Sequence, residues 1–315
     1  MVLYAGIGKQ TGLGTEVDPN IFLPLIRESV NVSREPLLAE TAIYRVPSEA
    51  SIPPVNASGE IELPLDVNSI VYLMYGVLGN IETTGSESPY THTITPVDEG
   101  RLPLWTLEIG HDSKARRFID AVVRRLSIEC PARELVSVTA EFLARKPKVQ
   151  SSQLSPSYNT RKFISFKGGT ITLDGSVQAN ISSITVEIEN DIPDDAFAVG
   201  DVYLADLYTQ GLTISGSFDM FFTDWSEFQR FISGTKTGVE PDGVGSATLQ
   251  LKFTDPDEDS MYLQIDLGEI VYNSAEVNID RRDMRVLSVE YRAIKWDLAN
   301  NKPIKVTVAN EVSSI

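Results

Sequence analysis

The stretch Leu135-Val-Ser-Val-Thr-Ala-Glu-Phe-Leu143 alternates apolar and polar side chains along its length. Successive side chains of a β-strand point to opposite faces of the sheet, so this stretch predicts a strand with one buried and one solvated face. Ile184-Thr-Val-Glu-Ile-Glu189 has the same alternation, and both stretches favour a mainly β fold. In the first, the apolar face holds Val136, Val138, Ala140 and Phe142, and the polar face holds Ser137, Thr139 and Glu141.

Stretches of this kind continue along the chain and are separated by turn residues such as Asp174-Gly175. Glycine, proline, asparagine and aspartate interrupt strands because they favour turn conformations. We expect further strands over residues 59–65, 104–109, 169–173, 212–222, 247–253, 261–267 and 286–294.

Two short helices are expected among these strands. Asp66 or Asn68 caps the first and Gly79 ends it, because a short polar side chain accepts from free N–H groups and glycine adopts the left-handed conformation at a helix end. Thr223 caps the second, which ends at Gly234. Both carry apolar stripes that predict core packing: Val67, Ile70, Val71, Met74, Val77 and Leu78 in the first, and Trp225, Phe228, Phe231 and Ile232 in the second.

The two helices occupy equivalent places in a repeated pattern. Ser58-Gly59 opens a strand that runs into the first helix, and Ser215-Gly216 opens one that runs into the second, at an offset of 157 residues. At an offset of 151, the apolar positions of 119–143 match those of 270–294. The order of elements indicates a duplication of about 150 residues, with a Ser/Pro-rich joint over 147–160. We therefore expect a first domain over 1–150, a linker over 151–162 and a second domain over 163–315.

The repeat also decides how residues 118–129 are interpreted. Their apolar positions fit a helical stripe, but the counterpart at 269–279 has Asn273 and Ser274 inside that stripe. We therefore expect a strand over 118–129. The basic pairs Arg116-Arg117 and Arg124-Arg125 indicate a solvated or interface face.

The composition is that of an acidic globular protein. The 315 residues include 44 acidic and 27 basic side chains, a formal net charge of −17, and 42% are hydrophobic, which is enough for a core and excludes a fully disordered chain. Nucleic acid is held largely by cationic side chains, so this chain is expected to repel DNA. No targeting segment is expected, and the longest mostly apolar stretch, 70–78, is too short to cross a bilayer.

Few residues offer catalytic or metal chemistry. The chain has one cysteine, Cys130, and two histidines, His92 and His111, which are too few for a zinc cluster or a Ser-His-Asp triad. We expect Cys130 to be a buried small hydrophobe and no cofactor or metal to be bound. The glycine-rich segment 6–15 lacks the spacing of a phosphate-binding loop, and the acidic run 255–259 lacks the spacing of a calcium-binding EF-hand, although a structural cation remains an alternative there.

Several motifs of the first 150 residues occur in an order that resembles a known family. Gly8-Lys9-Gln10-Thr11 precedes Gly14-Thr15, Ser58-Gly59-Glu-Ile-Glu-Leu63 runs into the helix that ends at Gly79, and Tyr90-Thr-His92 follows. A strand pair over 118–129 and 134–145 closes the series. The order is similar to that of the tail tube (major tail) proteins of long-tailed bacteriophages and related tailed viruses. The second half joins this resemblance only through the internal repeat.

The resemblance implies two tandem β-sandwich or half-barrel domains, each with one short flanking helix. In that family, subunits join their sheets edge to edge into rings with a continuous inner β-barrel, and the rings stack into a tube. Six-fold rings of single domains are typical, so a duplicated chain is expected to form trimers with pseudo-six-fold symmetry. Six chains are the alternative, if the second half is an outer decoration domain. Residues 1–15 are expected to form an arm that orders on assembly, with Gly8, Lys9, Gln10, Thr11, Gly14 and Thr15 as candidate inter-ring contacts.

The resemblance further implies a structural virion protein, made in the host cytoplasm, without enzymatic activity. Its implied partners are other copies of itself and the tape-measure, tail terminator and distal tail proteins, and viral DNA passes through the tube during ejection without specific binding. An acidic wall would repel the phosphates of that DNA. The candidate lumen-lining acids are Glu141, Glu187, Glu189 and Glu290.

Two other functions compete with this interpretation. The first is a tandem β-sandwich that recognises carbohydrate or a cell surface, which requires a platform of exposed aromatic side chains such as Trp105, Trp296 and Tyr158. The second is a carboxylate-dependent hydrolase, for which Asp257 and Asp259 are the candidate pair.

Overall fold

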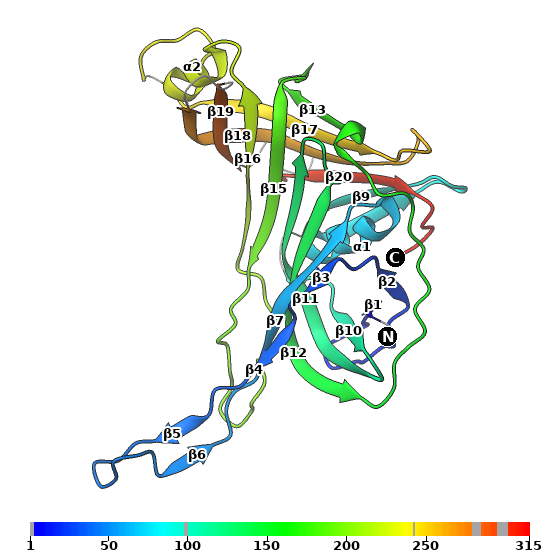
Figure 1. Ribbon diagram of the computed structural model, residues 1–315, viewed down its shortest axis with the longest axis vertical. Coiled ribbons are helices and arrows are strands. Elements are labelled where there is room, and N and C mark those ends of the chain that lie inside the picture. Colours follow the sequence, from blue (N-terminus) through cyan, green and yellow to red (C-terminus); the bar gives the residue numbers. More distant parts are fainter. Residues whose placement is uncertain (1–2, 98–99, 242, 279–284, 295–301) are drawn as a thin grey trace.

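The computed structural model describes residues 3–97, 100–241, 243–278, 285–294 and 302–315 (Figure 1). The described part is mainly β, with two α-helices, one 18-stranded antiparallel sheet system and a separate two-stranded hairpin. The sheet does not close into a barrel within one chain. The predicted fold class is confirmed.

Helix α1 (Val67–Leu78) lies where its caps predict it. The Asp66 carboxylate accepts from the backbone N–H groups of Asn68 and Ser69, both at 3.0 Å. Gly79 ends the helix in the left-handed conformation, with φ of 89°. All six residues of the predicted apolar stripe are buried. The helix contacts β11 and β15 of the ribbon defined below and also β8, β9 and β20, so it fills the core between these strands.

Four strand positions form a first quartet. In order across the sheet they are β3 (Arg27–Glu28) with β4 (Asn31–Ser33), then β7 (Asn56–Pro64), β12 (Ser137–Gln150) and β11 (Lys114–Pro131). We count β3 and β4 as one position because both pair with β7 in a single register. The strand expected over 118–129 is therefore confirmed as the centre of β11.

Four more strands form a second quartet. Their order is β15 (Ile181–Asp191), β16 (Gly211–Phe221), β19 (Val286–Ala293) and β18 (Tyr262–Asn278). The quartets meet where residues 125–131 of β11 pair with residues 183–189 of β15. We call the resulting run of eight strand positions the ribbon.

The first parts of β11 and β18 leave the ribbon and pair with further strands. β11 pairs with β10 (Trp105–His111), which pairs with β1 (Tyr4–Lys9) and so with β2 (Ile21–Leu23). β18 pairs with β17 (Ser246–Thr254) and β20 (Lys305–Asn310). Next to these lie β13 (Gly169–Leu173), β14 (Ser176–Val177), β9 (Tyr90–Pro96), β8 (Gly79–Thr84) and the short 3-10 helix η1 (Phe166–Gly168).

The two quartets share their connectivity and their irregularities. β7 precedes α1 and pairs with β12, as β16 precedes α2 (Ser226–Ser233) and pairs with β19. The β11–β12 ladder shifts register between Val123 and Arg125, and the β18–β19 ladder shifts between Tyr272 and Ser274. The β10–β11 and β17–β18 ladders also shift at matching places. Shared bulges of this kind are a feature of related sheets, because a bulge sets how a strand bends.

The ladders correct one of the two sequence offsets. Aligning the bulge at Arg124 with that at Asn273 gives an offset of 149 residues for the long hairpin, in place of 151. The offset of 157 for β7 and β16 agrees with the ladders that these strands make with β12 and β19. A two-residue error leaves every side chain on the same face of the strand, so the apolar pattern alone could not detect it.

The expectation of a free arm over residues 1–15 does not hold for its first part. Tyr4–Lys9 is strand β1, buried between β10 and β2. The glycines indicated flexibility, but they serve close packing: a Cβ at Gly6 would lie 3.1 Å from Phe22 Cε1, and one at Gly8 would lie 3.0 Å from the Asp18 carbonyl oxygen.

Helix α2 differs from its prediction in cap and in buried face. Asp224, not Thr223, accepts from the Ser226 N–H at 2.8 Å, while Gly234 ends the helix as expected. Of the predicted stripe, Phe228 and Phe231 are partly buried against the core, but Trp225 is exposed, and Glu227 and Arg230 are buried in addition. Arg230 pairs with Asp174 and lies 3.4 Å from Glu227, whose carboxylate accepts from the Tyr272 hydroxyl. This ion-pair network turns the charged face inward, which apolar periodicity could not predict.

The expected Ser/Pro-rich joint begins later than its composition indicated. β12 continues through Pro147, which lies opposite Phe118, as far as Gln150. β7 pairs with β12 only as far as Ala144, so Pro147 needs no partner on its other side. The division into domains over 1–150 and 163–315 stays a prediction.

Candidate assembly surfaces

The ribbon ends in two strand edges that no strand of the described residues pairs with. One is the outer side of β3 and β4, whose partner on the inner side is β7. The other is the side of β18 away from β19 between Ser274 and Asn278, beyond the end of β17 and beyond Tyr272, whose N–H donates to the Gly245 carbonyl at 2.9 Å. We call them the β3–β4 edge and the β18 edge. Unpaired strand edges attract other strands, because their N–H and C=O groups lack partners.

Side chains protect the β3–β4 edge. The Val30 N–H donates to Glu28 Oε2 at 3.1 Å, and Arg116 Nη1 donates to the Val30 carbonyl at 2.6 Å. Arg116 Nη2 also lies 2.7 Å from Glu28 Oε1. Charged side chains at an edge are a common means by which proteins suppress unwanted strand addition. The Arg116-Arg117 pair is predicted to lie on a solvated or interface face; Arg116 lies at this edge, whereas Arg117 is buried against Glu108.

The ribbon has one apolar and one polar face. The apolar face packs into the core through residues such as Ile61, Phe142, Ile128 and Val186. Cross-strand partners share a face, so the pairs Arg125–Glu141, Arg125–Glu189, Ser127–Glu187 and Ser217–Glu290 extend the polar face over both quartets. The acidic side chains on this face are Glu60, Glu62, Glu129, Glu141, Glu187, Glu189, Asp191, Asp219, Glu276 and Glu290.

The four candidate lumen acids therefore lie on one face, as the alternation of each strand required. Arg125 stands among them: its guanidinium lies 2.8 Å from Glu60, 3.2 Å from Glu141 and 3.9 Å from Glu187. Burial opposes the charged form, but the carboxylates of Glu141, Glu187 and Glu60 outweigh it and raise the pKa of Arg125. Arg124 at the bulge also pairs with Glu141, and Arg27 and Arg292 are further cations of this face, which remains predominantly acidic.

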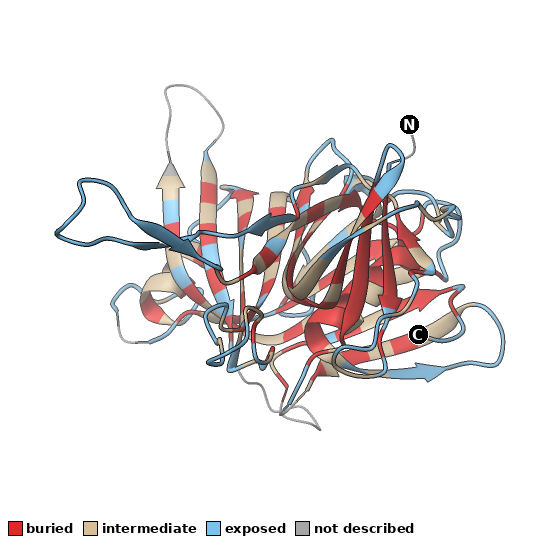
Figure 2. Cartoon of the chain, turned by 90° about the horizontal axis from the view of Figure 1, so that it is seen from below, coloured by how far each residue is buried: buried red, intermediate tan, exposed pale blue. Residues whose placement is uncertain are grey.

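A long hairpin projects from the first quartet. β5 (Leu37–Ala39) and β6 (Glu49–Ser51) pair with each other, and Figure 2 shows the hairpin standing away from the body with its length exposed. Its apolar side chains face solvent, and Ile43 is 82% exposed. Exposed apolar groups of this density are typical of contact sites. They are Leu37, Leu38, Ile43, Tyr44, Val46 and Ile52.

The corresponding loop of the second quartet, residues 192–210 between β15 and β16, packs against the first quartet. Ile192, Leu204 and Leu207 bury a cluster with Leu102, Leu104, Val122 and Leu143. The Val55 N–H donates to the Val202 carbonyl at 2.9 Å. Arg101 also pairs with Asp206. The connection after the first strand position of a quartet is thus a contact element inside the chain.

One family model matches residues 4–293, and its description is phage tail tube protein. The match spans nearly the whole chain. This chain belongs to the phage tail tube protein family. No curated protein matches the chain.

Membership settles the broad role of the protein. A tail tube protein is a structural protein of the bacteriophage virion, located in the tail, that self-assembles into a tube and associates with other tail proteins. The family is a structural one and not a known enzyme family. None of the helices in the described part of the chain is long and apolar enough to span a membrane.

The candidate inter-ring residues of the tail tube protein fall into two groups. Gly8 and Gln10 are buried inside the subunit, and the Gln10 side-chain amide accepts from Thr106 Oγ1 at 2.9 Å and donates to Asp120 Oδ1 at 3.0 Å. Lys9, Thr11, Gly14 and Thr15 are exposed. Lys9 lies over the Tyr75 ring at 4.7 Å, and the Gly14 N–H donates to Asp120 at 2.6 Å. The structure therefore leaves only the exposed members available for contacts with another subunit.

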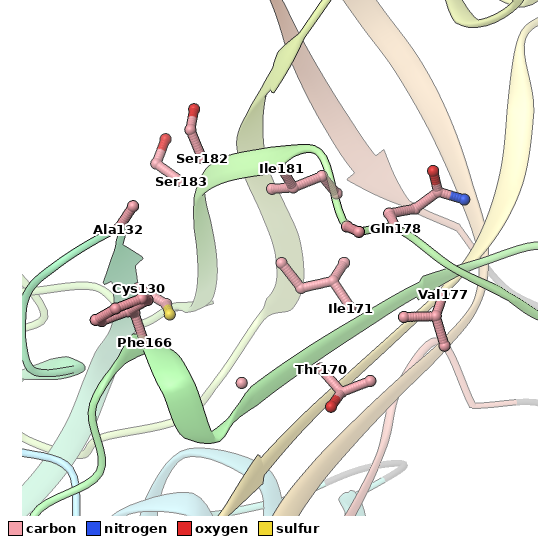
Figure 3. A pocket seen from close by; sticks show the side chains of 12 residues that line it. Cys130, Ala132, Phe166, Thr170, Ile171, Val177, Gln178, Ile181, Ser182 and Ser183 are labelled. Carbon is pink, nitrogen blue, oxygen red and sulfur yellow. The ribbon is translucent and has the colours of Figure 1, made fainter.

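Cys130 is buried, as predicted, beside a small pocket at the junction of the quartets (Figure 3). Burial raises the pKa of its thiol to about 11, so the reactive thiolate is scarce at neutral pH. No histidine or carboxylate is among the lining residues, which include Phe166, Thr170, Ile171 and Ile181. The pocket offers no partner for nucleophilic catalysis.

The remaining competing sites have structural roles. Asp255, first in the acidic run, accepts from the N–H groups of Asp257 and Glu258 and binds Arg161, which stabilises the loop. In the described ranges, no group of three or more acidic, histidine or cysteine side chains could hold a metal ion. Trp105 is fully buried, so it cannot join an aromatic carbohydrate platform, and Trp296 lies outside the described residues.

Sequence reasoning missed the two edges, the hairpin and the charged pair that protects Val30. Periodicity shows that a strand forms but not which strands end a sheet. One signal was present in the sequence: Ser58-Gly59 and Ser215-Gly216 mark equivalent strands, β7 and β16, whose outer neighbours β3–β4 and β15 hold equivalent places in the two halves.

Proposed function

We propose that three copies of this tail tube protein join their ribbons edge to edge into a closed ring, and that such rings stack into the hollow tube of the tail. One observation supports this most directly: the chain already joins two similar quartets through the β11–β15 pairing and, among its described residues, leaves one open edge at each end. Repeating the same contact between chains satisfies both edges. With two quartets per chain, three chains make a ring of pseudo-six-fold symmetry.

The proposal treats each half of the chain as a tube domain, over 1–150 and 163–315, with 151–162 as the linker. The strand order supports this division, because each half contributes four strand positions to the ribbon and the two halves share its bulges. A second half that only decorated the tube would have no need of strand edges equivalent to those of the first.

The polar face of the ribbon is the proposed lumen wall. Its acidic side chains, including Glu141, Glu187, Glu189 and Glu290, would keep DNA phosphates from adhering as the genome passes through during ejection. The apolar face supports this orientation, since it is already covered by α1 and the neighbouring strands of the same chain.

Contacts between rings are assigned to the parts that project from the ribbon. These are the exposed hairpin β5–β6 and the exposed residues Lys9, Thr11, Gly14 and Thr15. The ends of the tube would meet the tape-measure, tail terminator and distal tail proteins, and the subunit would be made in the host cytoplasm before incorporation into the virion.

Electron microscopy of the purified protein at high concentration tests the assembly. Rings or hollow tubes are expected, and native mass spectrometry of isolated rings should give three chains per ring. Six chains per ring would overturn the trimer and favour a decorating second half. A protein that remains monomeric under all conditions would contradict self-assembly.

A further inference from the structure

We propose that the β18 edge of one copy pairs antiparallel with the β3–β4 edge of a second copy, with Ala275 opposite Val32 and Val277 opposite Val30. This inference rests on the proposed function, because it names the strands and the register that would close the ring. Its partner is a second copy of this chain.

The proposed contact takes as its template the pairing of β11 with β15, which joins the two quartets inside the chain. There Leu126 lies opposite Ile188 and Ile128 opposite Val186. These four side chains are between 1% and 3% exposed, so the pairing seals the apolar face of the sheet. On the polar face Arg125 lies opposite Glu189 and Ser127 opposite Glu187.

The bulge at Asn273 shows which residues of β18 correspond to which residues of β11. Arg124 of β11 corresponds to Asn273 of β18, so Leu126 corresponds to Ala275 and Ile128 to Val277. In β11 this part of the strand holds β15 on the side away from β12. In β18 the same part has only β19 beside it in the described residues, and the side equivalent to the β15 site is open.

Gly59 and Gly216 show which residues of β3–β4 correspond to which residues of β15. A Cβ on Gly59 would lie 2.4 Å from the Ser29 carbonyl oxygen, and one on Gly216 would lie 2.1 Å from that of Thr185. Gly59 and Gly216 are equivalent in the repeat, so Ser29 corresponds to Thr185. The β4–β7 and β15–β16 ladders give the same alignment, which places Val30 at Val186 and Val32 at Ile188.

Burial distinguishes the two equivalent places. Ile188 is 1% exposed because β11 covers it, whereas Val32, at the matching place, is 41% exposed. The register brings Val32 against Ala275, which extends the apolar face across the contact. On the polar face it sets Glu276 opposite Asn31 and Ser274 opposite Ser33, so no like charges meet directly.

The β3–β4 edge can pair with a second copy only after the Glu28 and Arg116 side chains release the backbone of Val30. In the single chain the Val30 N–H and C=O are occupied by Glu28 and Arg116, whereas the equivalent Val186 lies in register with Ile128 of β11. The Glu28 and Arg116 side chains already contact each other, so they can remain paired when the backbone of a second copy replaces them. This exchange favours assembly by copies in the right register over indiscriminate strand addition.

Cysteine cross-linking tests the register. Glu276 and Asn31 correspond to Ser127 and Glu187 of the β11–β15 ladder. Just beyond the end of that ladder, and five positions from Ser127, the Ala132 N–H donates to the Ser182 carbonyl at 2.8 Å. Hydrogen-bonded and non-hydrogen-bonded pairs alternate along an antiparallel ladder, so Ser127–Glu187, and with it Glu276–Asn31, is a non-hydrogen-bonded pair. Such pairs have Cα atoms about 4.5 Å apart, within the range of a disulfide. Chains with Glu276→Cys and chains with Asn31→Cys are produced together, oxidised and separated by electrophoresis without reductant. A covalent dimer is expected, and each variant alone should give none.

Ser274→Cys with Ser33→Cys is a second in-register pair and should also give dimer. Ser274→Cys with Ser29→Cys is the matched control, on the same face but four positions out of register, and should not cross-link. The parent chain, with Cys130 alone, gives the background. The register is overturned, and the ring is not, if electron microscopy shows rings or tubes but neither in-register pair gives a covalent dimer. The same holds if rings or tubes form and the control pair gives as much dimer as the in-register pairs. If the protein forms neither covalent dimers nor rings, both the register and the proposed ring are overturned.

Discussion

At the scale of single residues, two glycines and a histidine explain motifs whose purpose the sequence did not show. Gly59 and Gly216 lie where a neighbouring strand passes so closely that a side chain would meet its backbone carbonyl. His92 of the Tyr-x-His motif is fully buried and joins β9 to the C-terminal segment. These residues are needed for packing between strands rather than for chemistry.

Gly216→Ala is expected to destabilise the subunit. The new Cβ would lie 2.1 Å from the Thr185 carbonyl oxygen and 2.5 Å from the Tyr291 hydroxyl, so β15 and β16 must move apart. Overpacking of this kind costs roughly 1–3 kcal/mol. Chemical unfolding checks this, with Ser215→Ala as the neighbouring control, which should have a small effect. Equal stability of the two variants would mean that the strands are not as close as described.

His92 predicts a pH dependence of stability. Its Nε2 lies 3.0 Å from Asn310 Oδ1 and 2.9 Å from the Val312 carbonyl, and Nδ1 lies 2.9 Å from Thr83 Oγ1, which suits a neutral ring with the proton on Nε2. Burial lowers its pKa below the usual value. Above about pH 6.5 both folded and unfolded states are neutral at this site. As pH falls below that value only the unfolded chain gains the proton, so the free energy of unfolding decreases.

The loss should reach at most about 1.4 kcal/mol per pH unit, the limit for one proton. Unfolding by urea at a series of pH values between about 7.5 and 5.5, where carboxylates contribute little, measures it. His92→Gln keeps a polar side chain but does not titrate, so its stability should vary less over this range. The same slope in both proteins would exclude His92 as the source.

At the scale of elements, the hairpin β5–β6 and the loop over 192–210 hold equivalent places but differ in environment. The loop packs on the first quartet, whereas the hairpin has no such cover and exposes its apolar residues. Because nothing in the core depends on Ile43 or Val46, which are 82% and 70% exposed, the hairpin is free to contact another subunit.

Ile43→Ser combined with Val46→Ser should therefore leave folding unchanged and impair tube formation. Thermal unfolding is expected to match the parent chain, while electron microscopy should show fewer or shorter tubes with rings still present. Val177→Ser and Val199→Ser, which remove exposed valines elsewhere, provide the control. Tubes of normal length from the hairpin variant would show that its apolar side chains make no contact between rings.

Local signals predicted most elements but not how the sheet ends. Asp66 and Gly79 fixed α1, since caps act within a few residues, and alternation fixed β12 and β15. Alternation could not separate an offset of 151 from 149, and composition mistook the buried β1 for an arm. The charged face of α2 is buried only because Asp174 and Tyr272, far along the chain, pair with it. Long-range partners of this kind have no local sequence signal.

At the scale of the whole molecule, the ribbon separates charge from packing. One face is the subunit's own core, and the other carries cross-strand rows of acids from both quartets, interrupted by Ser, Thr and Arg side chains. If the ribbons of three chains close on each other, these rows form the inner wall of the tube, and the overall charge of −17 acquires a function beyond solubility.

Glu189→Lys combined with Glu290→Lys should make assembled tubes bind DNA. Both positions are exposed on the polar face, so the change replaces repulsion by attraction to phosphates. Retention of a short fluorescent duplex by purified tubes measures the effect, which should weaken as salt is added. Glu82→Lys with Glu87→Lys, exposed away from the ribbon, is the matched control. Equal retention by both variants would argue against an acidic lumen formed by this face.

The most direct test is a cryo-electron microscopy reconstruction of the assembled tube that resolves individual strands. The reconstruction should show three chains per ring, with residues 274–278 of each chain paired to residues 29–33 of the next and the polar face of every ribbon turned toward the lumen. Rings in which these two edges stay unpaired, or in which the polar face lies outside, would contradict the account.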